Sequence, residues 1–143
     1  MTESVLPDPG TPFGERVRQR LAGEQIIWLT TVGKDGTPQP NPVWYLWQDD
    51  HILIYNGADV KRLAHIAARP TVALSFDGNG KGGDIVVIAG RASIVSDEPV
   101  PHEQPGFVEK YLAGMVRMYG TPEHFTETHP VVIRVDFTKV RGF

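Results

Sequence analysis

The sequence predicts a mainly β fold with minor α, in which six strands form a barrel covered by helices. Short runs of β-branched and aromatic residues recur along the chain and are separated by turn-forming residues. The helical patterns are few and do not alternate with the strands, which argues against a Rossmann-type fold. The length of 143 residues suits one domain with its own core. We therefore expect a flexible N-terminal arm over residues 1–10 and a single barrel domain over residues 11–143.

The first element after the arm is a short amphipathic helix. Thr11 is a typical N-cap residue, and Pro12 occupies the first helical position. Gly23 is expected to end the helix. Apolar residues recur at every fourth position between these limits, at Phe13, Val17 and Leu21.

The rest of the chain divides into strands, turns and two further helices. Strands are expected at 26–32, 39–47, 51–56, 71–76, 85–95 and 131–137. A turn at 33–36 closes with Asp-Gly and joins the first two strands, and the glycine-rich segment 77–83 is expected to be a flexible hairpin loop. Helices are expected at 60–68 and 107–119, and Gly90 is expected to mark a bulge or bend.

The composition excludes several classes of site and partner. The chain has no cysteine, which rules out disulfides, thiolate metal sites and cysteine nucleophiles. The net charge of −3 argues against a nucleic-acid partner, although it leaves room for a local basic pocket. The longest apolar run, 85–89, is too short to cross a bilayer, and the N-terminus lacks the pattern of a signal peptide. We expect a cytoplasmic protein that does not insert into membranes.

Three prolines alternate along the second predicted strand, at Pro38, Pro40 and Pro42. Alternate residues of a strand direct their backbone groups to the same edge, so this edge lacks three hydrogen-bond donors but keeps its carbonyls. The pattern is typical of an edge protected against aggregation. It equally suits an edge that borders a bound ligand, and spacing alone does not choose between the two interpretations.

A basic segment opens the helix after the third strand, with the sequence Asn56-Gly57-Ala58-Asp59-Val60-Lys61-Arg62. A glycine turn, a helix N-terminus and two cations together suit a phosphate group. A solvated Lys-Arg pair is the commoner origin of such a pattern. No histidine spacing typical of a metal site occurs, and no nucleophile elbow is present. The apolar stripe from Phe107 to Met118 is more typical of core or dimer packing than of a cofactor site.

The order of these segments resembles a known family. Its most specific part is GTPQPNPVWY at 36–45, which is followed by KRLAHIAARP, TVALSF and DIVVIAGRASIV. This order is similar to the pyridoxamine 5′-phosphate oxidase-like split β-barrel superfamily, and within it to the deazaflavin (coenzyme F420) dependent oxidoreductases of actinobacteria. The resemblance covers about residues 20–143 and implies a six- to seven-stranded, FMN-binding-like split barrel.

The resemblance also implies a site. In this family two barrels form a homodimer, and the cofactor lies in a groove between them. By this likeness, the strand with Pro42, Val43 and Trp44 runs along the cofactor ring, with Asn41 beside it. Lys61 or Arg62 holds the phosphate, and the adjoining loop is formed by Tyr55, Asn56 and Gly57. His65 stands where the family commonly has asparagine, next to the same phosphate.

The expected activity is hydride transfer between coenzyme F420 and an unsaturated or quinone-like small molecule. One alternative keeps the fold and uses FMN in an oxidase or reductase. Another is a non-enzymatic carrier of flavin or haem. In the first two cases the cofactor carries the chemistry, which explains why no catalytic group stands out. Solvent, Tyr45 and His65 remain open as the proton donor.

Overall fold

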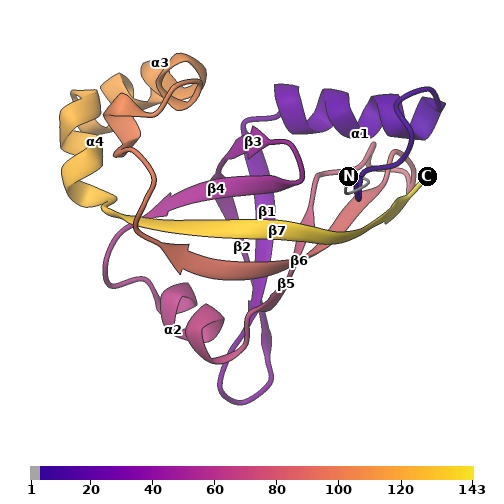
Figure 1. The fold of residues 1–143 in the computed structure, drawn as a ribbon, viewed down its shortest axis with the longest axis horizontal. Coiled ribbons are helices and arrows are strands. Elements are labelled where there is room, and N and C mark those ends of the chain that lie inside the picture. Colours follow the sequence, from indigo (N-terminus) through magenta and orange to yellow (C-terminus); the bar gives the residue numbers. More distant parts are fainter. Residues whose placement is uncertain (1–3) are drawn as a thin grey trace.

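The computed structural model describes residues 4–143 and shows a curled antiparallel sheet with helices at its ends (Figure 1). The seven strands are β1 (Ile26–Val32), β2 (Pro38–Trp44), β3 (Leu46–Gln48), β4 (His51–Asn56), β5 (Thr71–Ser75), β6 (Val86–Val95) and β7 (Val131–Gly142). The helices are α1 (Pro12–Gly23), α2 (Lys61–Ala68), the short 3-10 helix η1 (Pro101–Glu103), α3 (Phe107–Tyr119) and α4 (Pro122–Thr128). The predicted mainly β barrel of six to seven strands with helical covers is confirmed.

The strand order of the sheet is β2-β1-β5-β6-β7-β4-β3, and this order makes the sheet curl. Strands β2 and β3 lie at opposite edges of this order, yet only Tyr45 separates them in the chain. The sheet must therefore curl until its two edges meet. This closure brings the free edge of β2 close to β4 and to the helices that follow β6.

The prediction of a single strand at 39–47 is wrong, because the strand is interrupted at Tyr45 and divides into β2 and β3. The backbone N–H of Tyr45 donates to the Tyr111 hydroxyl at 2.9 Å, so its partner comes from α3 and not from a strand. The Tyr111 hydroxyl in turn donates to the carbonyl of Gln25 at 2.6 Å. One buried side chain thus supports the point at which the barrel turns its corner.

Two further elements differ from expectation. Strand β7 continues to Gly142, five residues beyond the expected end at 137, because it pairs along the whole of β6. Helix α4 was not predicted, although Thr121 and Pro122 repeat the capping signature of Thr11 and Pro12 at α1. Thr11 accepts a bond from the backbone of Gly14 at 3.0 Å, so the predicted cap of α1 is confirmed.

The predicted bulge at Gly90 is confirmed by a shift in the β6–β7 register between Ala89 and Gly90. A Cβ atom at Gly90 would lie 2.6 Å from Val135 Cγ1 and 2.9 Å from the carbonyl oxygen of Asp136. The position therefore requires glycine for close approach of the two strands. The bulge lets the two longest strands bend with the barrel.

The core has two parts. The larger part fills the barrel with aliphatic side chains from β1, β4, β5, β6 and β7, closed at one end by Val17 and Leu21 of α1. The smaller part lies between the sheet and α3 and α4, and it is rich in aromatic residues such as Phe107, Tyr111 and Phe125. Figure 1 shows α3 and α4 together at one end of the sheet, with α1 at the other end near the C-terminus.

The expected N-terminal arm spans residues 1–10, of which 1–3 lie outside the described residues. The described part contacts the barrel. Leu6 is buried in the larger core, and Arg18 donates to the carbonyl of Pro7 at 2.6 Å. The flexibility of the arm stays a prediction. No helix within residues 4–143 is long and apolar enough to cross a membrane.

Candidate functional site

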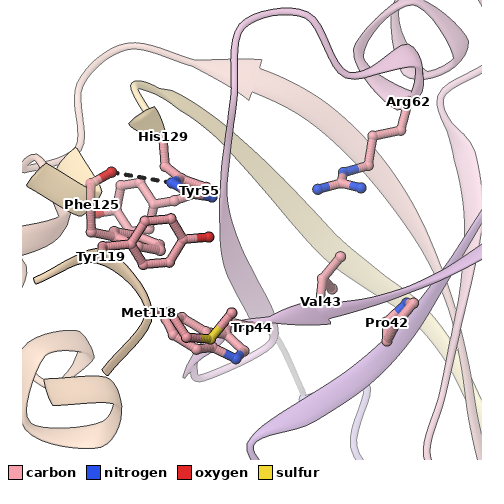
Figure 2. Close-up of a pocket in the computed structure, with 9 residues that line it drawn as sticks. All are labelled: Pro42, Val43, Trp44, Tyr55, Arg62, Met118, Tyr119, Phe125 and His129. Carbon is pink, nitrogen blue, oxygen red and sulfur yellow. Dashed lines mark hydrogen bonds between the residues drawn. The ribbon is translucent and has the colours of Figure 1, made fainter. Parts of the chain in front are cut away.

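A cavity of about 190 Å³ lies where the free edge of β2 meets α2, α3 and α4. Figure 2 shows its lining side chains, which come from five separate elements and the segment after α4. Its walls are mostly aromatic, and one cation, Arg62, projects into it. The lining residues are Pro42, Val43, Trp44, Tyr55, Arg62, Met118, Tyr119, Phe125 and His129.

The β2 wall is an edge on which the three prolines offer acceptors and no donors. Strand β2 pairs with β1 on one side, and no strand of residues 4–143 pairs with it on the other. The register sets Pro38 opposite Val32 and Pro42 opposite Trp28. Because prolines cannot donate, the intervening residues pair with β1, and the prolines present carbonyl oxygens at the free edge. Pro42 borders the cavity and Pro38 is exposed, so this edge is both protected and available to a ligand.

The Arg62 side chain is fixed by Asn56. Its Nε–H donates to Asn56 Oδ1 at 2.7 Å. Burial lowers the pKa of Arg62 from its usual value, although a guanidinium stays charged at any physiological pH. None of the ion pairs found among residues 4–143 includes Arg62. The cavity therefore contains a half-buried positive charge that no acidic side chain neutralises.

Trp44 forms the centre of an aromatic wall. Its ring stacks on Tyr111 at 4.6 Å and on Phe125 at 5.4 Å between centroids. It also packs against α3 at Gly114, where an added Cβ would lie 2.9 Å from two atoms of the indole. Tyr55 also lines the cavity, and its hydroxyl donates to the carbonyl of Pro99 at 2.6 Å. Such a wall suits a flat, aromatic ligand.

His129 completes the wall beside α4. Its ring stacks on Phe125 with centroids 4.0 Å apart and planes 6° apart. Its Nδ1 lies 2.8 Å from the hydroxyl oxygen of Thr128 and 3.2 Å from the carbonyl oxygen of Phe125, whereas Nε2 makes no hydrogen bond within the described residues. In Figure 2 the second ring nitrogen points away from Phe125. Burial and the nearby Arg62 lower the pKa of His129, so the neutral ring is favoured at physiological pH.

The structure brings five of the predicted site residues together at the cavity: Pro42, Val43, Trp44, Tyr55 and Arg62. The other five lie outside its lining. Asn56 is fully buried behind Arg62, and Gly57 lines a neighbouring recess with Asp59 and Thr128. Lys61 is exposed, and the backbone of Asn41 pairs with Leu29 of β1 and not with the free edge. His65 is turned toward the β1–β2 hairpin, where its Nδ1 lies 3.0 Å from the hydroxyl of Thr31.

Neither side chain considered as a proton donor lines the cavity. Tyr45 is fully buried, and its hydroxyl donates to the carbonyl of Leu21 at 2.8 Å on the α1 side of the barrel. His65 is bound to Thr31, as described above. The titratable side chains that do line the cavity are Tyr55, Arg62, Tyr119 and His129.

Sequence reasoning missed four lining residues: Met118, Tyr119, Phe125 and His129. Met118 ends the apolar stripe of α3, which is more typical of packing, and Tyr119 follows it. The capping signature at Thr121 and Pro122 signals α4, which carries Phe125 and leads into His129. No spacing pattern in the sequence connects His129 to Arg62. Within residues 4–143, no group of three or more histidine, aspartate or glutamate side chains is arranged to hold a metal ion.

A curled antiparallel half-barrel with helices at its ends defines the class of protein, which is a split barrel. The family model for pyridoxamine 5′-phosphate oxidase matches residues 13–143. The chain therefore belongs to the pyridoxamine 5′-phosphate oxidase-like family. No curated protein matches its sequence.

Solved structures share the fold at low sequence identity. General Stress Protein 26 from Bacillus anthracis is 19% identical, with a TM-score of 0.66 over 88% of this chain and 89% of that one. An F420 reductase is 22% identical, with a TM-score of 0.61 over 86% and 94% of the two chains. The haem storage protein HutZ from Vibrio cholerae is 9% identical, with a TM-score of 0.62 over 90% and 92%. At these identities the likeness shows the split-barrel fold alone.

Proposed function

We propose that this protein is an oxidoreductase that binds the deazaflavin coenzyme F420 and transfers a hydride between it and an unsaturated or quinone-like small molecule. The observation that carries the proposal is the unneutralised Arg62 guanidinium in an aromatic cavity bordered by the proline-rich edge of β2. The family includes oxidoreductases that use flavin or F420, and one structure of this fold is an F420 reductase.

The residues present fit such a cofactor. The pyrimidine end of a flavin-type ring carries an N–H, which suits the carbonyls that Pro42 and its neighbours present. Arg62 suits the phosphate, because a guanidinium binds phosphate oxygens through several N–H groups at once. Trp44 and Phe125 offer flat apolar surface to the ring system. When bound, the deazaflavin supplies a hydride donor and acceptor, which the side chains of the chain lack.

The protein's own contribution is binding and orientation. Arg62 holds the anionic end, the β2 edge fixes one side of the ring, and the aromatic wall excludes water from it. His129 and Tyr119 are the neutral polar groups of the cavity that a substrate can reach. The open side of the cavity receives the substrate. The cavity of one chain is smaller than a flavin ring system with its phosphate, so we further propose that a homodimer completes the groove.

F420 differs from FMN by an anionic glutamate tail, which favours additional cations along the binding edge. Arg69 and Lys34 lie beside the end of β1, where Arg69 Nε donates to the carbonyl of Val32 at 2.8 Å. Lys81, by contrast, lies in the loop after β5 whose residue Asp77 accepts a bond from Arg20 of α1. Arg69 and Lys34 thus lie at the β1–β2 hairpin and Lys81 does not, so the two hairpin cations are those available to an anionic tail.

Fluorescence titration with F420 and with FMN tests the proposed cofactor. We expect F420 to bind more tightly, and we expect reduced F420 to be oxidised when a quinone such as menadione is added. Replacement of Arg62 by alanine should weaken F420 binding by about tenfold to a hundredfold, since charged hydrogen bonds contribute about 1.5–3 kcal/mol. The matched control is Lys61→Ala, which removes the neighbouring exposed cation and should change the affinity little.

Two results would overturn the F420 assignment. A preference for FMN of tenfold or more supports an FMN-dependent oxidase or reductase. Equal losses in the Arg62→Ala and Lys61→Ala variants would mean that general positive charge, and not the cavity cation, attracts the cofactor.

A second candidate function is haem binding without catalysis, and His129 is the observation that favours it. Its Nδ1 is held by the Thr128 hydroxyl and the Phe125 carbonyl, and its Nε2, which has no hydrogen-bond partner among residues 4–143, lies at an aromatic cavity, an arrangement that suits a metal-ligating histidine. A haem titration followed by the Soret band tests this function. Binding that His129→Ala abolishes, in a protein that binds neither F420 nor FMN, would replace the enzymatic proposal.

A further inference from the structure

Asn56 is a polar side chain with no contact to solvent. It is fully buried at the end of β4, where a polar group needs hydrogen-bond partners. Its amide nitrogen donates to the carbonyls of Ile54 at 2.9 Å and Val131 at 3.2 Å. Both amide hydrogens are used, and the orientation of the amide is therefore fixed. The remaining oxygen faces Arg62.

That oxygen holds the guanidinium of Arg62 through one hydrogen bond. Arg62 Nε–H donates to Asn56 Oδ1 at 2.7 Å, and the other four N–H groups of the five on a guanidinium make no hydrogen bond within the described residues. Figure 2 shows the guanidinium pointing into the cavity from α2. The donors that remain are those of the two terminal nitrogens, which match phosphate and carboxylate oxygens.

The chemical type of residue 56 matters as much as its position. An aspartate there would orient Arg62 equally well, but it would neutralise the positive charge and compete with an anionic ligand. An amide orients the guanidinium and leaves its charge available. Among the described residues that line the cavity there is no aspartate or glutamate, so no carboxylate offsets the charge of Arg62 there.

We infer that Asn56 is a positioning residue that aims Arg62 at the phosphate of the cofactor without neutralising it, and so makes the cavity selective for phosphate-bearing ligands. The inference rests on the proposed function, because it assigns the phosphate to Arg62. It changes the role expected for Asn56, since a fully buried side chain with all its polar atoms engaged does not touch the ligand.

Matched ligand pairs test this role. One pair is FMN and riboflavin, and the other is F420 and its phosphate-free deazaflavin chromophore. The ratio of dissociation constants within a pair reports the phosphate contact and cancels the ring contact. We expect Asn56→Ala to reduce this ratio about tenfold and to leave binding of the phosphate-free ligand within twofold of wild type. Asn56→Asp should reduce the ratio at least as much.

A double-mutant cycle with Arg62→Lys separates positioning from a general structural effect. If Asn56 acts through Arg62, the double variant should lose no more phosphate selectivity than the Arg62→Lys variant alone. Additive losses, or an unchanged ratio in Asn56→Ala, would overturn the inference. If Arg62→Ala itself leaves the ratio unchanged, the phosphate assignment of the proposed function fails instead.

A second measurement uses the wild-type protein alone and needs no ligand and no variant. In the wild-type protein the Nε–H proton of Arg62 should exchange slowly with water in proton–nitrogen NMR spectra, because Asn56 accepts its hydrogen bond in a half-buried position. Exchange as fast as that of the exposed Arg117 would show that the contact does not persist in solution and would contradict the inference.

Discussion

At the scale of single residues, one cation of the cavity, Arg62, interacts with two neutral side chains. Asn56 orients Arg62, and His129 lies close enough for Arg62 to help lower its pKa. Burial is the larger cause of that shift. An anion bound at Arg62 would offset the effect of the Arg62 charge on the pKa of His129. Binding of an anionic ligand and protonation of His129 therefore favour each other.

Stability should consequently depend on the charge state of His129. Its pKa is lower in the folded state than in the unfolded chain, where it is about 6.5. The unfolded state therefore binds more protons, and the stability present at neutral pH decreases as pH falls through about 6.5 toward the folded pKa. His51 also has a lowered pKa and contributes with the same sign.

Urea unfolding between pH 7.5 and 5 measures this dependence. His129→Asn should lose less stability over this range than wild type, because asparagine does not titrate, while the contribution of His51 persists in both proteins. Parallel pH profiles for the two proteins would contradict a lowered pKa at His129.

At the scale of elements, the junction between β2 and β3 connects the barrel to α3. The Tyr111 hydroxyl accepts from the Tyr45 backbone, lies 3.0 Å from the Tyr45 carbonyl oxygen, and donates to Gln25. Burial raises the pKa of Tyr111, so the hydroxyl stays protonated and able to donate. The same ring supports Trp44, which connects the barrel corner to the cavity wall.

Tyr111→Phe should destabilise the protein by about 1–3 kcal/mol, because it leaves buried backbone groups without a partner. Chemical denaturation measures the loss. The matched control is Tyr119→Phe, whose hydroxyl makes no hydrogen bond among residues 4–143 and whose removal should cost about 0.5 kcal/mol or less. Equal losses in the two variants would show that the Tyr111 hydroxyl does not support the junction.

The elements also show what local sequence can predict. The bounds of β1, β4 and α3 follow from residue pattern, since β-branched runs and helical spacing act locally. The break at Tyr45 does not, because its partner Tyr111 is 66 residues away in the chain. For the site, the proline edge and Arg62 could be predicted from motifs, whereas His129 and Phe125 reach the cavity only through the packing of α4 against Trp44.

At the scale of the whole molecule, α3 carries exposed apolar side chains beside the cavity. Leu112, Val116 and Met118 keep 47%, 50% and 59% of their surface accessible in the single chain. Met118 also lines the cavity. Exposed apolar residues grouped on one helix are typical of an interaction surface, and this location supports the proposed homodimer with the groove at its interface.

Placing aspartate at both Leu112 and Val116 should convert the dimer to a monomer and weaken cofactor binding, since buried charges are costly at an interface. Light scattering coupled to gel filtration reports the mass. Thr138→Asp, which adds charge at an exposed site on β7, should leave the dimer intact. A wild-type protein that is monomeric at micromolar concentration would contradict the proposed dimer.

The central claim is that one cavity holds a phosphate-bearing flavin-type cofactor between the β2 edge and Arg62. A crystal structure of the protein with bound F420 tests it most directly. We predict that the ring lies along Pro42, Val43 and Trp44 and that the phosphate accepts hydrogen bonds from the terminal nitrogens of Arg62. Cofactor density at another surface, or a phosphate that Arg62 does not contact, would contradict the claim.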